Sequence, residues 1–82
     1  MGLFSFLGKK DPKQKAVDIF VKARKVGLSV EAALRQAVDS AVADKVYPDR
    51  KTAAEELYKA VITLVDKDEK ADLEKAKRKA AL

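Results

Sequence analysis

Apolar side chains recur at helical spacing through most of this chain. Three amphipathic stretches stand out, at residues 12–26, 29–47 and 50–66, because their apolar residues fall three or four positions apart. Charged residues occupy the opposite face of each stretch. No segment alternates apolar and polar residues as a half-buried strand does. The pattern predicts an all-α fold, a small antiparallel three-helix bundle with short connections.

Two short joints separate the predicted helices. Gly27 can adopt the left-handed conformation that ends a helix, and Ser29 can cap the helix that follows. Asp49 can cap the third helix. Thr52 and Glu55 have the spacing of a capping box. Joints this short favour helices that pack against their neighbours in the chain.

The predicted core collects the apolar faces of the three helices. It consists of Val17, Ile19, Phe20, Ala23, Val30, Leu34, Val38, Leu57, Tyr58, Val61, Leu64 and Val65. Residues 67–82 differ in composition, since most of them are charged and Leu73, Ala76 and Ala80 leave a thin apolar line. We expect a charged helical extension there, which either continues the third helix or follows a break at Asp66.

The first ten residues depart from the pattern of the helical domain, which we place at residues 11–66. Four large apolar side chains come before any charge, and four lysines follow: Leu3, Phe4, Phe6 and Leu7, then Lys9, Lys10, Lys13 and Lys15. This order suits an interfacial anchor, in which the apolar side chains insert and the lysines meet lipid phosphates. The segment is similar to the short apolar-then-lysine starts of many peripheral bacterial proteins. The same apolar side chains can instead complete the domain's core or fill a groove of a partner protein.

Insertion of residues 1–10 would give weak binding. Four Leu or Phe side chains that are half inserted contribute roughly 3–6 kcal/mol, and each nearby Lys adds about 1 kcal/mol on an anionic leaflet. The sum is comparable to a single myristoyl chain, which anchors only marginally and reversibly. We therefore expect membrane binding that depends on lipid charge and weakens with salt.

Composition narrows the possible chemistry. The chain has a net charge of +5 and contains no cysteine and no histidine. Disulfides, thiolate catalysis and zinc–thiolate sites are therefore excluded, and the commonest general base is missing. No glycine-rich phosphate loop or nucleophile elbow is present. We expect no enzymatic activity, no catalytic residues and no cofactor.

Membrane-spanning and metal-binding motifs are also missing from the sequence. No apolar run approaches the ~18–20 residues of a transmembrane helix. The charges of residues 1–10 follow the apolar region, whereas the charges of a secretory signal peptide precede it, so we do not expect a signal peptide here. A calcium loop counted from Asp66 would need glycine at Ala71 and glutamate at Lys77, so no metal site is expected.

The first joint resembles the core of a helix-turn-helix. The resemblance rests on Ala23, Gly27, Leu28 and Ser29, followed by a helix with Ala33 and Leu34. It would imply nucleic-acid contacts, for which the candidate residues are Lys22, Arg24, Lys25 and Arg35. Only Arg35 is basic in the first turns of the would-be recognition helix, and Glu31 would face phosphate. The mismatch favours an ordinary joint between two helices.

The net charge is concentrated at the N-terminal end, since residues 1–26 carry +5 and residues 27–66 carry −2. This distribution suits an anionic partner that meets one end of the molecule. We expect a non-enzymatic, cytoplasmic accessory protein, peripheral at the inner face of a membrane, that presents its bundle to a protein partner. Two alternatives stay open. One is a small basic nucleic-acid-binding protein, and the other is a structural subunit of an oligomeric or phage assembly.

Overall fold

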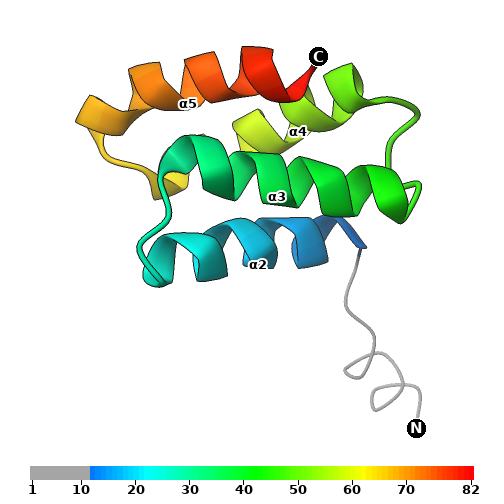
Figure 1. The fold of residues 1–82 in the computed structure, drawn as a ribbon, viewed down its shortest axis with the longest axis horizontal. Helices are drawn as coiled ribbons and strands as arrows, with labels where there is room; N and C mark the ends of the chain where they lie inside the picture. The colour runs from blue at the N-terminus through cyan, green and yellow to red at the C-terminus, as the bar shows by residue number, and fades with distance from the viewer. Residues whose placement is uncertain (1–11) are drawn as a thin grey trace, which may run out of the picture.

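The computed structural model describes residues 12–82, which form four helices (Figure 1). They are α2 (Pro12–Lys25), α3 (Val30–Ala43), α4 (Arg50–Val61) and α5 (Lys67–Ala80), with a short 3₁₀ turn, η1 (Ile62–Leu64), after α4. No strand occurs in these residues. The all-α prediction is confirmed. The antiparallel three-helix bundle is not confirmed, because the charged C-terminal stretch forms a fourth helix that packs on the others.

Helix α3 is the centre of the domain. It packs against α2, α4 and α5, and Figure 1 shows it between α2 and α5. Its buried stripe includes Ala33, Ala37 and Ala41, small side chains that let the neighbouring helices approach closely. The largest fully buried side chains come from all four helices: Phe20, Leu34, Val38, Leu57, Val61 and Leu73. Residues 12–82 therefore supply a continuous core.

Helix α5 corrects the expected charged extension. Leu73 is 0% exposed, and Ala76 and Ala80 are 1% and 4% exposed. The helix packs against α3 and α4. Of the two alternatives for this stretch, the break at Asp66 is the right one, since Asp66 has extended backbone angles and occupies the N-cap position of α5. A thin line of small apolar residues is enough to fit a helix into the groove between two alanine-rich neighbours.

Leu64 corrects the predicted core. Its side chain is 54% exposed, because α4 ends at Val61 and the 3₁₀ turn changes the angular spacing of the residues that follow. Four other predicted core residues are only partly buried and pack against the core from its edge: Val17, Ile19, Tyr58 and Val65. The remaining predicted core residues are buried.

The first joint has the predicted cap geometry. Gly27 has a φ of 96°. Its N–H donates to the Arg24 carbonyl at 3.1 Å, and the Leu28 N–H donates to the Ala23 carbonyl at 3.0 Å. This hydrogen-bond pair is a Schellman motif. The Ser29 hydroxyl then accepts from the Ala32 N–H at 3.2 Å and caps α3, so both predictions for this joint are confirmed.

The second joint begins earlier than expected. Helix α3 ends at Ala43 rather than at Tyr47, because Lys45 takes a left-handed φ of 57°. The Val46 N–H donates to the Ala41 carbonyl at 2.9 Å, and the Lys45 N–H donates to the Val42 carbonyl at 3.0 Å. The joint is therefore a second Schellman motif, with lysine at the position that glycine usually holds.

Asp49 caps α4, as predicted. Its carboxylate accepts from the Thr52 N–H at 2.7 Å. The capping box that starts at Thr52 is wrong, because Thr52 is the third residue of the helix and its own N–H needs the cap.

Candidate docking surface

The excess positive charge of the described residues lies in one helix. Helix α2 carries five Lys or Arg residues and one acidic residue, a net charge of +4. Residues 26–82 carry eleven basic and eleven acidic residues and are neutral overall. The N-terminal segment leads directly into α2. An anionic partner would therefore be attracted to α2 rather than to the rest of the domain.

The first turn of α2 lies against the joint between α3 and α4. The Lys15 ammonium is 3.1 Å from the Asp44 carboxylate, and the Lys13 ammonium is 5.9 Å from the centroid of the Tyr47 ring. The Lys15 side chain is still 54% exposed. The other residues predicted for docking, Leu3, Phe4, Phe6, Leu7, Lys9 and Lys10, lie outside the described residues.

One side of α2 combines lysines with exposed apolar surface. Lys15, Ile19, Lys22 and Val26 follow one another at intervals of three or four residues, so they form one row along the helix. We call these four residues the α2 stripe. Val26 lies just after the last residue of α2, but its N–H donates to the Lys22 carbonyl at 3.1 Å and continues the helical turn.

Val26 is an exposed residue that the apolar periodicity of the sequence does not distinguish from the buried ones. It is 78% exposed. No local sequence signal reports this exposure, because it depends on which helices pack beside the end of α2: the last residues of α4 and α5, Val61 and Ala80, are buried. Beside Val26 is a hollow of about 390 Å³. Its lining is mostly apolar and holds one charged residue, Lys22, among Ile19, Lys22, Ala23, Val26, Leu28 and Gln36.

The other side of α2 has mixed charge. A hollow of about 410 Å³ is lined by Val21, Arg24, Lys25, Leu64, Asp66 and Glu69. Two acidic residues therefore lie opposite the two basic ones. This side is less suited to an anionic surface than the α2 stripe.

Arg24 has a structural role. Its guanidinium pairs with the Glu69 carboxylate of α5 and donates to the Leu28 carbonyl at 2.8 Å. The Arg24 and Glu69 side chains are 31% and 30% exposed. The pair ties α5 to the end of α2. Arg24 was a candidate nucleic-acid contact, but much of its charge is already compensated inside the domain.

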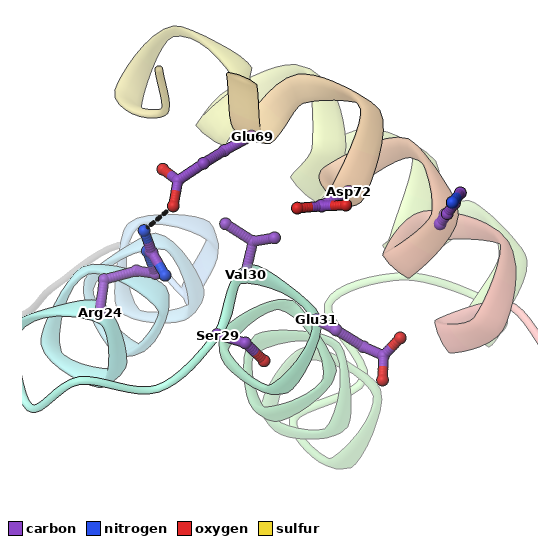
Figure 2. A pocket seen from close by; sticks show the side chains of 7 residues that line it. Arg24, Ser29, Val30, Glu31, Glu69 and Asp72 are labelled. Atoms are coloured by element: carbon purple, nitrogen blue, oxygen red, sulfur yellow. Dashed lines mark hydrogen bonds and ion pairs between the residues drawn. The ribbon is translucent and has the colours of Figure 1, made fainter. Parts of the chain in front are cut away.

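A further hollow lies where the first joint meets α5. Figure 2 shows the Arg24–Glu69 pair at one side of it and Val30 between the helices. It has a volume of about 310 Å³, and its lining mixes both charge signs: Arg24, Ser29, Val30, Glu31, Glu69, Asp72 and Lys75. Across residues 12–82 there is no group of three or more acidic side chains that could hold a metal ion.

Helix α3 is poorly suited to the role of a recognition helix. Most of its apolar face is covered by the other three helices. Its exposed charges are Glu31, Arg35 and Asp39, a net charge of −1. Glu31 is 2.8 Å from the Lys79 ammonium, and this hydrogen bond holds the pKa of Glu31 below its ordinary value. Asp39 pairs with Arg50 of α4 at 2.7 Å, so both acidic residues of this face are compensated, and Arg35 is the single basic residue that α3 offers to a phosphate. Of the candidate nucleic-acid contacts, Lys22 and Lys25 are exposed on α2, and Arg35 is exposed on α3.

None of the helices in residues 12–82 is long and apolar enough to cross a membrane. The chain matches no protein-family model, and no curated protein or solved structure shows significant similarity to it.

Proposed function

We propose that this protein is a non-enzymatic accessory protein that docks on an anionic membrane surface through residues 1–10 and the basic helix that follows. The apolar side chains Leu3, Phe4, Phe6 and Leu7 insert at the interface, while Lys9, Lys10, Lys13 and Lys15 meet lipid phosphates. The helical domain then presents a surface to a protein partner. The proposed location is the cytoplasmic face of the membrane.

The observation that carries the proposal is the distribution of charge and apolar side chains along the chain. Four large apolar side chains lead into a helix of net charge +4, and residues 26–82 are neutral. The core of residues 12–82 already receives a large buried side chain from every helix. This supports assigning the four apolar residues to a surface outside the domain rather than to the core.

Lipid is favoured over nucleic acid for a specific reason. A basic helix attracts any polyanion, but insertion of Leu and Phe side chains is rewarded by the acyl region of a bilayer and not by a phosphate backbone. Helix α3, the would-be recognition helix, carries Arg35 as its single basic residue, which points the same way. The proposal therefore predicts stronger binding to anionic vesicles than to DNA or RNA at equal salt.

The double variant Phe4→Asp/Phe6→Asp tests the proposal. Two half-inserted Phe side chains are lost and two negative charges are added, so the affinity for anionic vesicles should fall about 100-fold or more. Binding is measured by co-sedimentation, and folding by circular dichroism. The melting temperature should stay within a few degrees of the wild-type value.

The matched control is Ala71→Asp/Leu82→Asp, which adds the same charge at two exposed positions, with Leu82 95% exposed. It should bind vesicles with an affinity much closer to that of the wild type. If Phe4→Asp/Phe6→Asp unfolds the domain, the segment belongs to the core. If both double variants lose the same affinity, net charge alone drives binding and insertion plays no part.

A further inference from the structure

We propose that the α2 stripe is a second contact with the bilayer, so that α2 lies along an anionic lipid surface with Val26 at the interface. This inference rests on the proposed function and goes further, because it fixes the orientation of the folded domain. It uses residues 12–82 alone.

The charges of α2 complement an anionic surface. Lys22 is exposed in the C-terminal half of α2. Lys15 lies near the other end of the same helix, with its side chain 54% exposed. Lysines therefore lie toward both ends of a helix of 14 residues, about 21 Å long. A flat anionic surface is a partner that can meet both ends at once.

Two acidic residues lie near the stripe, and one of them is ion-paired. Asp18 accepts a hydrogen bond from the Gln14 amide at 3.0 Å, and Asp44 pairs with Lys15 at 3.1 Å. The hollow beside Val26 has no acidic residue in its lining. The hollow therefore adds no acidic charge to this side of α2, in contrast to the side that holds Asp66 and Glu69.

The α2 stripe also exposes apolar surface. Val26 is 78% exposed. The hollow next to it adds surface from Ile19 and Leu28, with Lys22 at its edge. An apolar side chain beside lysines is the arrangement that lets the side chain enter the interface while the ammonium groups stay at the headgroups. A flat lipid surface can contact the exposed Val26 and the neighbouring lysines at the same time.

This orientation has a consequence for the partner-binding surface. Figure 1 shows α5 on the opposite side of α3 from α2. With α2 against the membrane, the outer face of α5 is turned toward the solvent. A protein partner would then reach α5 and not the α2 stripe.

Single tryptophans test the orientation directly, because the chain contains none. Val26→Trp places a fluorophore on the α2 stripe, and Ala71→Trp places one at an exposed position of α5. Each full-length variant is mixed with vesicles of phosphatidylserine and phosphatidylcholine that carry brominated acyl chains. We expect a blue shift and strong quenching for Val26→Trp and neither for Ala71→Trp.

The outcomes separate this inference from the proposed function. If the Val26→Trp variant sediments with the vesicles but its fluorescence is neither shifted nor quenched, the orientation is wrong and docking through residues 1–10 still holds. Equal quenching in the two variants also overturns the orientation. If the chain does not bind the vesicles at all, the proposed function fails, and this inference fails with it.

Neutral substitutions give a second, independent measurement. Lys22→Gln should weaken binding to anionic vesicles about fivefold, the contribution of one lysine. Lys70→Gln removes the same charge from an exposed position of α5 and should change the affinity far less. Equal losses in the two variants would contradict a specific contact at α2.

Discussion

At the scale of single residues, the two Schellman motifs make the clearest comparison in this molecule. Gly27 and Lys45 hold the same position in equivalent hydrogen-bond patterns, with φ angles of 96° and 57°. A side chain in the left-handed region costs roughly 1–2 kcal/mol. A Cβ atom added at Gly27 would meet nothing within 4 Å, so any substitution there is opposed by backbone conformation alone.

Substitutions at the two positions should therefore have opposite effects. We expect Gly27→Ala to lower the free energy of unfolding by about 1 kcal/mol and Lys45→Gly to raise it by about 0.5–1 kcal/mol. Urea unfolding followed by circular dichroism measures both. If the Lys45→Gly variant is less stable than the wild type, the lysine side chain adds more to the free energy of unfolding than its left-handed backbone conformation costs.

The cap at Asp49 gives stability a pH dependence. The hydrogen bond from the Thr52 N–H holds the pKa of Asp49 below its ordinary value of 3.8. The folded state therefore favours the ionised carboxyl. Its contribution is complete above the pKa of the unfolded chain and is lost as the pH falls through the folded pKa. The hydrogen bond from Lys79 likewise lowers the pKa of Glu31, so ionised Glu31 also favours the folded state.

The free energy of unfolding should therefore decrease between about pH 5 and pH 3. Asp49→Asn keeps a cap acceptor without an ionisable group, so its stability should depend less steeply on pH in this range. Urea titrations at several pH values measure the slope. The slope should not vanish, because Glu31 remains. An identical slope in both proteins would mean that the cap is not linked to protonation.

At the scale of helices, α5 is the element that the sequence pattern describes least well. Its buried line consists of one leucine and two alanines among many charged residues, and the same line suits a solvated extension. Whether such a helix packs is decided by the groove that receives it. That groove is formed by residues distant in the sequence, so local periodicity does not reveal it.

Leu73→Ala tests the packing of α5. The side chain is 0% exposed, so we expect a loss of about 2–5 kcal/mol in the free energy of unfolding. Leu64→Ala is the matched control, since Leu64 is 54% exposed and should lose less than about 1 kcal/mol. Chemical unfolding measures both. Equal small losses in the two variants would show that α5 is a solvated extension and not a packed helix.

The sequence predicts the ends of elements well where a residue has a special conformation or cap. Gly27, Ser29 and Asp49 hold the positions expected of them. The sequence does not predict the end of α3, because the lysine at position 45 carries no signal for a left-handed turn. It fails at Leu64 because a change from α to 3₁₀ geometry shifts the buried side without changing residue type. The lysines of the candidate docking surface are visible in the sequence, but the exposure of Val26 is not.

At the scale of the whole molecule, charge is distributed asymmetrically. Helix α2 has a net charge of +4, and residues 26–82 are neutral. Some of this charge also serves the fold, since Lys22, Arg24 and Lys25 lie in the last turn of α2, where cations stabilise the helix dipole. The proposed docking gives Lys22 a second role, at the surface of an anionic bilayer.

Co-sedimentation of the full-length protein with vesicles tests the central claim most directly. Phosphatidylcholine vesicles with and without phosphatidylserine are compared at about 0.05 M and 0.5 M salt. At low salt the protein should pellet with the anionic vesicles and stay in solution with the neutral ones. High salt should release most of it, because electrostatic attraction is then screened over a few ångströms. Failure to pellet with anionic vesicles at low salt would contradict the account.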